Sequence, residues 1–134
     1  MGKKYFGYIF WSYILLMLVL TVVPWSTHVK LGFWIFKFRL DYWLHLGAYF
    51  GLAFLFILWQ LNEFLDKHFY ELFRSFAFCI AFAFGTELIQ LFIPVRSFSL
   101  KDFVAGSAGV TFAFAIFILN KGWLKNSKLR LINV

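Results

Sequence analysis

Four long apolar runs dominate the hydrophobic pattern of the chain. A helix needs about 20 apolar residues to cross the hydrocarbon core of a bilayer. The apolar residues are continuous rather than alternating, and the runs are too few for a closed barrel, so they predict transmembrane helices. The four runs cover residues 5–23, 41–61, 73–93 and 100–119.

The connections between these runs predict how the helices are arranged. Pro24 follows the first run and Pro94 follows the third, and a proline ends a helix. Short connections make sequential helices antiparallel neighbours. We therefore expect an all-α integral membrane protein, an antiparallel four-transmembrane-helix bundle with short loops that forms a single domain over residues 1–134.

The first run has the features of a signal sequence without its cleavage site. Lys3 and Lys4 precede an apolar stretch that is longer than the core of a signal peptide. No pair of small residues suited to cleavage follows it. We expect this run to be a retained signal anchor.

The distribution of lysine and arginine predicts the orientation of the bundle. With four spans, both chain ends and the second loop share one side, and cytoplasmic segments carry the excess of basic residues. Both termini are therefore expected in the cytoplasm, with the first and third loops outside. The two groups are Lys3, Lys4, Lys67, Arg74, Lys121, Lys125, Lys128 and Arg130, eight in all, against Lys30, Lys37, Arg39, Arg96 and Lys101, which are five.

The composition supports a membrane protein and argues against nucleic acid as a partner. Hydrophobic residues make up 63% and charged residues 14% of the chain, and the mean hydropathy is +0.80. A soluble domain carries roughly 25% charged residues. The net charge of +7 comes from residues that flank the apolar runs, which favours contact with anionic lipid headgroups. A single cysteine, Cys79, excludes a disulfide within the chain.

Polar residues converge on one end of the predicted bundle. They lie at the start of the second helix, at the end of the third, in the third loop and at the start of the fourth. Four antiparallel helices bring these positions together at one membrane face. These candidate binding residues are Asp41, His45, Tyr49, Glu87, Gln90, Arg96, Ser97, Ser99 and Asp102.

Two pairs in this group point to chemistry within the membrane. Asp41 and His45 are four residues apart, so they share a helix face. A carboxylate as deep as Glu87 costs roughly 2–3 kcal/mol unless it faces the bundle and finds a partner, and we expect Gln90 to hydrogen-bond it. Structural alternatives remain open: Asp41 as a helix cap, His45 as a packing residue and the Glu87 pair as a lock between helices.

The third loop combines an arginine with serines. Arg96 is suited to binding a phosphate or carboxylate through two parallel hydrogen bonds, although it could also extend to the interface. Ser99 and Asp102 form the pattern of a capping box at the start of the fourth helix. The small residues Ala105 and Gly109 allow close helix packing, which we expect against the third helix. On the other side, we expect residues 62–71 to form a solvated loop.

The pattern of these residues resembles the VanZ-like family over essentially the whole chain. The matching segments are Asp41-Tyr-Trp-Leu-His45-Leu-Gly-Ala-Tyr49, Glu87-Leu-Ile-Gln90, Pro94-Val-Arg96-Ser97-Phe-Ser99, Asp102, Gly106 and Gly109. Tyr42 and the Ala105-Gly106-Ser107 segment depart from the usual lysine and asparagine of the family. The resemblance implies a cell-envelope protein of the kind associated with resistance to the glycopeptide antibiotic teicoplanin, without implying a reaction.

Three functions are compatible with this sequence. The first is a protein that binds a lipid headgroup, a lipid-linked cell-wall precursor or a lipoglycopeptide at the outer leaflet. The second is a membrane enzyme acting on a lipid-linked phosphate or glycan, with His45 and Glu87 as candidate catalytic residues. The third is a proton-coupled lipid transporter that uses Glu87. In a variant of the enzyme, a divalent metal would be held by Asp41, His45, Glu87 and Asp102. No spacing is diagnostic of a metal site, so we expect no metal or cofactor, and the oligomeric state stays open.

Overall fold

The computed structural model describes residues 2–23, 34–35, 38–66, 69–94 and 97–132. Within these ranges the chain forms four long helices and a two-stranded antiparallel ladder in which Trp34 pairs with Arg39. The sequence did not predict the ladder. The elements are α1 (Gly2–Val22), β1 (Trp34–Ile35), β2 (Phe38–Arg39), α2 (Leu40–Asp66), α3 (Phe69–Gln90) and α4 (Leu100–Ile132).

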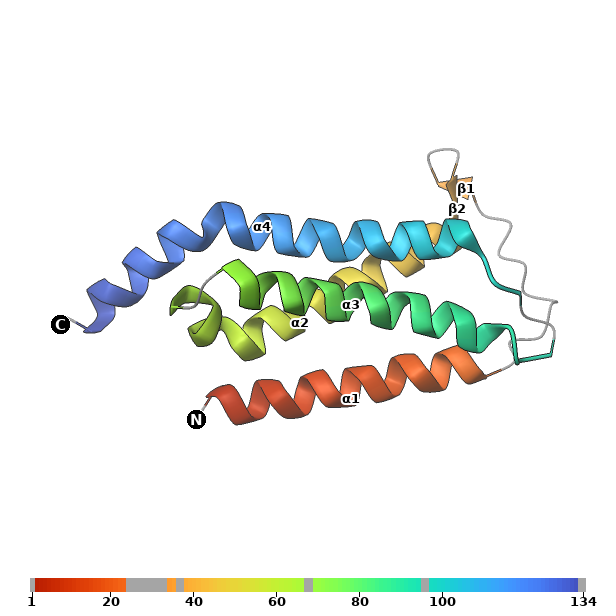
Figure 1. Ribbon diagram of the computed structural model, residues 1–134, viewed down its shortest axis with the longest axis horizontal. Coiled ribbons are helices and arrows are strands. Elements are labelled where there is room, and N and C mark those ends of the chain that lie inside the picture. The colour runs from red at the N-terminus through yellow and green to blue at the C-terminus, as the bar shows by residue number, and fades with distance from the viewer. Residues whose placement is uncertain (1, 24–33, 36–37, 67–68, 95–96, 133–134) are drawn as a thin grey trace.

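The helices are long and apolar enough to cross a membrane. Each contains a candidate span, which confirms the predicted all-α membrane bundle. Successive helices run in opposite directions, so the start of α1, the end of α2, the start of α3 and the end of α4 lie at one end of the bundle (Figure 1). We call the other end, where α2 and α4 begin and α3 finishes, the polar end. The spans are Lys4–Val22, Asp41–Leu61, Phe69–Gln90 and Leu100–Ser127.

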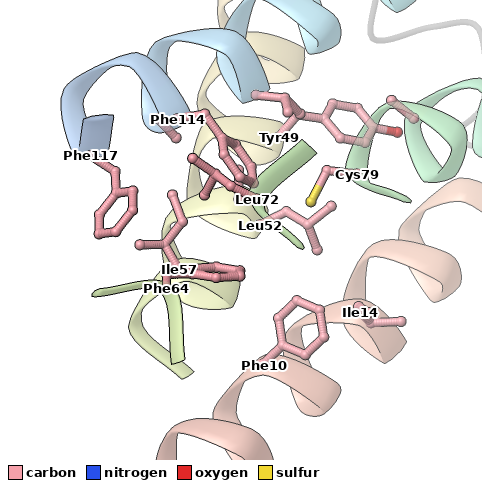
Figure 2. Packing of buried hydrophobic residues seen from close by; sticks show 14 of the residues in the cluster. Phe10, Ile14, Tyr49, Leu52, Ile57, Phe64, Leu72, Cys79, Phe114 and Phe117 are labelled. Carbon is pink, nitrogen blue, oxygen red and sulfur yellow. The ribbon is translucent and has the colours of Figure 1, made fainter. Parts of the chain in front are cut away.

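The core of the bundle is built mainly from aromatic and aliphatic side chains of all four helices. Phe10 of α1 stacks on Trp59 of α2 with ring centroids 5.3 Å apart. Leu52 of α2 and Cys79 of α3 are fully buried between the helices (Figure 2). Many other large apolar side chains point outward, such as Leu15 of α1, which is 63% exposed. In a membrane, these outward side chains face lipid instead of water.

The small residues of α4 pack against α2, so the expected contact with the third helix is wrong. A Cβ added at Gly109 would clash with the carbonyl oxygen of Leu46 and lie 2.9 Å from the amide nitrogen of Phe50. A Cβ added at Gly106 would lie 2.6 Å from the Tyr49 ring. The helices α2 and α4 run in the same direction (Figure 1), and their interface is the most extensive in the bundle. Only glycine lets the two backbones approach so closely.

Helix ends differ from the predicted boundaries, most of all in the second, third and fourth helices. The third helix begins at Phe69 and ends at Gln90, after which the backbone tightens into i→i−3 hydrogen bonds that continue to Ile93. The fourth helix continues to Ile132 because polar residues after the apolar run remain helical. The loop expected over residues 62–71 is wrong, because α2 continues to Asp66 and Glu71 in α3 pairs with Arg74 at 2.7 Å.

Candidate functional site

Glu87 is the most deeply buried charged residue of the polar end. Helix α3 carries it about two turns before Pro94, and its side chain has no exposed surface. One carboxylate oxygen, Oε2, accepts a long hydrogen bond of 3.4 Å from the backbone amide of Ser99. The other oxygen, Oε1, is buried without a hydrogen-bond partner among the described residues. A buried polar atom without a hydrogen bond costs roughly 1–3 kcal/mol, so packing alone does not account for a carboxylate at this position.

His45 of α2 lies beside Oε1 of Glu87. Its Nε2 is 3.4 Å from Oε1 of Glu87, which is an ion-pair distance longer than a strong charge-assisted hydrogen bond. Its Nδ1 lies 2.9 Å from the backbone carbonyl oxygen of Asp41. Because a carbonyl only accepts, Nδ1 carries the proton and Nε2 faces the carboxylate. Nε2 can therefore donate a hydrogen bond to Oε1 only when the imidazole ring carries a proton on both nitrogens.

The capping box at the start of α4 forms only in part. The backbone amide of Asp102 donates to Oγ of Ser99 at 3.3 Å, as the sequence predicts. The reciprocal bond is absent among the described residues, since the Ser99 amide donates to Glu87 and Oδ1 of Asp102 is buried without a hydrogen-bond partner. Ser99 therefore links Asp102 to Glu87 at the start of α4.

Tyr49 and Thr86 form the floor of the cluster, one turn deeper in the bundle. Their hydroxyl groups are hydrogen-bonded to each other, and Thr86 donates its own proton to the Ala83 carbonyl at 2.9 Å. Tyr49 is therefore the donor to Thr86. Sequence reasoning missed Thr86, although its position next to Glu87 in an otherwise apolar segment was a usable signal. The Tyr49 ring also covers Gly106, which ties this floor to α4.

A pocket of about 340 Å³ opens beside His45 between α1, α2 and α3. We call it the His45 pocket. Tyr49, Gln90 and Thr21 contribute its other polar side chains, and Met17 and Leu44 are among its apolar ones. The expected hydrogen bond between Gln90 and Glu87 is not formed in the described structure. Helix α3 directs Glu87 towards α2 and the start of α4, whereas Gln90 faces the pocket.

Of the remaining predicted site residues, Ser97 stands apart from this cluster and Asp41 contributes to it. Ser97 is exposed at the surface of the third loop. Arg96 lies outside the described residues. Asp41 takes part through its backbone carbonyl, which fixes the His45 ring.

Acidic and histidine side chains of the described chain do not form a metal centre. Among these residues, no group of three or more histidine, cysteine, aspartate or glutamate side chains could hold a metal ion. Asp41, His45, Glu87 and Asp102 were the set that the sequence offered for a divalent metal. His45 and Glu87 pair with each other instead.

Comparison with known proteins gives no relative to set beside this geometry. No protein-family model, curated protein or solved structure matches the chain. The polar cluster must therefore be interpreted from its own chemistry.

Proposed function

We propose that the chain is a VanZ-like cell-envelope protein that binds the polar head of a membrane amphiphile at the polar end. The observation that carries this proposal is the buried Glu87, whose Oε1 has no hydrogen-bond partner among the described residues. His45 lies between this oxygen and an open pocket. A ligand group in the His45 pocket contacts the ring directly and reaches the Glu87 charge through it.

The charges of the cluster favour a ligand rich in hydrogen-bond donors. Glu87 and Asp102 both keep a buried oxygen without a hydrogen-bond partner in the described part of the chain. Ionised carboxylates only accept hydrogen bonds, so hydroxyl and amide N–H groups complement them better than phosphate does. Sugars and peptides supply such groups. A lipid-linked cell-wall precursor or a lipoglycopeptide antibiotic combines them with an acyl tail that remains in the bilayer.

Glycopeptide resistance follows from this binding if the ligand is the drug or its target. A protein that holds a lipoglycopeptide such as teicoplanin at the membrane surface lowers the amount that reaches the cell-wall precursor. A protein that holds the precursor shields the drug's target. Both routes place the polar end at the outer leaflet, where such drugs act.

Cysteine labelling tests the proposed orientation. With Cys79 replaced by alanine, Ser97→Cys should react with a membrane-impermeant maleimide in intact cells, because this exposed position is expected outside. Asn126→Cys, exposed near the end of α4, should react only after the cells are opened. The reverse pattern would place the polar end in the cytoplasm.

Catalysis is the alternative that the His45–Glu87 pair favours. Nε2 of His45 lies 3.4 Å from Oε1 of Glu87, and the His45 side chain lines the pocket. Such a pair can act as a general acid or base on a lipid-linked phosphate or glycan. In this case the ligand of the His45 pocket is a substrate that leaves as a product.

One experiment separates the two functions. Purified protein in nanodiscs is incubated with a lipid extract of the cell envelope, or with teicoplanin, and then analysed by mass spectrometry. We expect an added mass on the protein and unchanged lipids. An altered lipid would instead identify an enzyme. If no mass is added to the protein and no lipid is altered, both functions are contradicted.

A further inference from the structure

A second cavity lies on another face of α2. It is an apolar groove of about 460 Å³ between the first turns of α2 and α4, and it shares no lining residue with the His45 pocket. Trp43 and Leu46 form its α2 wall. Ala105 and Ala108 leave space on the α4 wall because their side chains are small. We call this cavity the α2–α4 groove.

The location of the groove determines what can fill it. Its residues lie at the start of the candidate spans Asp41–Leu61 and Leu100–Ser127, so they lie in the membrane near one surface. Trp43 is 41% exposed, and tryptophan is typical of the boundary between hydrocarbon and headgroups. The volume is within the usual range of ligand pockets. An acyl chain therefore fits the groove in volume and in polarity.

Lys101 gives the groove a charge at the same end. It lines the groove from the first turn of α4, its side chain is exposed, and it forms no ion pair within the described part of the chain. The start of α4 adds the partial positive charge of a helix N-terminus. These charges complement an anionic headgroup at the membrane surface, directly above an acyl chain.

We propose that the α2–α4 groove binds one acyl chain of an anionic phospholipid, whose phosphate pairs with Lys101. This site is separate from the His45 pocket and does not rest on the function proposed for it. A bound lipid there fills the space next to the close contact at Gly109 and supports the α2–α4 interface. The chain thus prefers anionic lipid at one defined position, in addition to the general attraction of its positive charge.

Fluorescence quenching by brominated lipids tests this site at Trp43. The protein is placed in phosphatidylcholine nanodiscs that contain a minor fraction of brominated phosphatidylglycerol or of brominated phosphatidylcholine. The Trp43 signal is the difference between wild type and Trp43→Phe. We expect about fivefold enrichment of the anionic lipid at Trp43, which one lysine near the surface provides. Equal quenching by the two lipids would overturn the proposal.

Two variants separate the headgroup contact from the groove. Lys101→Gln leaves the packing unchanged and should remove most of the preference for the anionic lipid at Trp43. Ala105→Leu should fill the groove and reduce Trp43 quenching by both lipids, whereas Ala77→Leu, on the outer face of α3, should leave the quenching unchanged. If Lys101→Gln retains the full preference, the phosphate contact is excluded. If Ala105→Leu folds and is quenched like wild type, the groove is excluded.

Discussion

Replacing Gly109 with alanine is expected to destabilise the bundle by about 3 kcal/mol, the upper end of the usual cost of overpacking. The new methyl group would clash with the backbone carbonyl of Leu46 and crowd the amide of Phe50. Backbone atoms of a helix cannot move aside as a flexible side chain can. The two helices must separate, and their interface is the most extensive in the molecule. The measurement is the melting temperature of the purified protein in detergent.

The controls for this prediction are two glycines elsewhere in the bundle. A Cβ at Gly47 in α2 or at Gly85 in α3 would meet nothing within 4 Å. Alanine is the better helix former by about 1 kcal/mol, so both substitutions should leave the melting temperature unchanged or raise it. If Gly109→Ala has the same melting temperature as Gly47→Ala, α2 and α4 do not approach as closely as described.

Glu87→Gln is the second substitution with a large expected effect, and it separates function from structure. Glutamine nearly matches the protonated carboxyl group in shape, and its oxygen can still accept the Ser99 amide. We expect the variant to fold with a melting temperature close to that of wild type. If the proposed function is right, it should lose the drug resistance that we propose for this protein, because it removes the carboxylate that faces His45. Drug-susceptibility assays in cells and melting curves in detergent provide the two readings.

Glu71→Gln is the matched control, since it makes the same change at the other end of α3. Glu71 pairs with Arg74 and lies far from the polar end along the helix (Figure 1). We expect it to leave the phenotype intact. A companion substitution is Arg96→Lys, which keeps the positive charge but loses the ability to donate two parallel hydrogen bonds. Like Glu87→Gln, this variant should fold and lose activity. If Glu87→Gln melts at a lower temperature and loses activity only in proportion to this loss of stability, Glu87 is a structural lock between helices.

The sequence predicted the spans and the convergence of polar residues because both follow from one rule. Apolar runs of bilayer length must be helices, and the up-and-down order then fixes which ends share a membrane face. Asp41, Glu87 and Ser99 lie far apart in sequence, and this order alone brings them to the polar end. The Ser99 cap also followed from local spacing, because a capping box is a contact within one helix turn.

Contacts between helices were less accessible from the sequence. The small residues around Gly109 predicted a close approach to another helix. Sequence order favours antiparallel neighbours as partners, whereas the observed partner is the parallel helix α2. Gln90 faces the His45 pocket because residues three apart on a helix point in directions that differ by about 60°. Whether Gln90 contacts Glu87 or the His45 pocket depends on the rotation of α3 about its axis, which packing determines.

Hydrogen-bond partners were the least predictable feature of the site. The Ser99 amide could bond within the capping box or across to Glu87, and both choices satisfy local rules. Thr86 looked like an ordinary polar residue until Tyr49 of another helix was placed against it. Buried oxygens without hydrogen-bond partners can be recognised only in three dimensions, and those of Glu87 and Asp102 now mark the candidate site.

The central claim is that the Glu87–His45 cluster binds an amphiphile of the cell envelope. Native mass spectrometry of wild type, Glu87→Gln and Glu71→Gln, each purified with the lipids of its own membrane, tests this most directly. We expect the same bound species on wild type and Glu71→Gln, and at least about tenfold less of it on Glu87→Gln, because a lost charged contact is worth roughly 1.5–3 kcal/mol. Identical bound masses on all three proteins would contradict the claim.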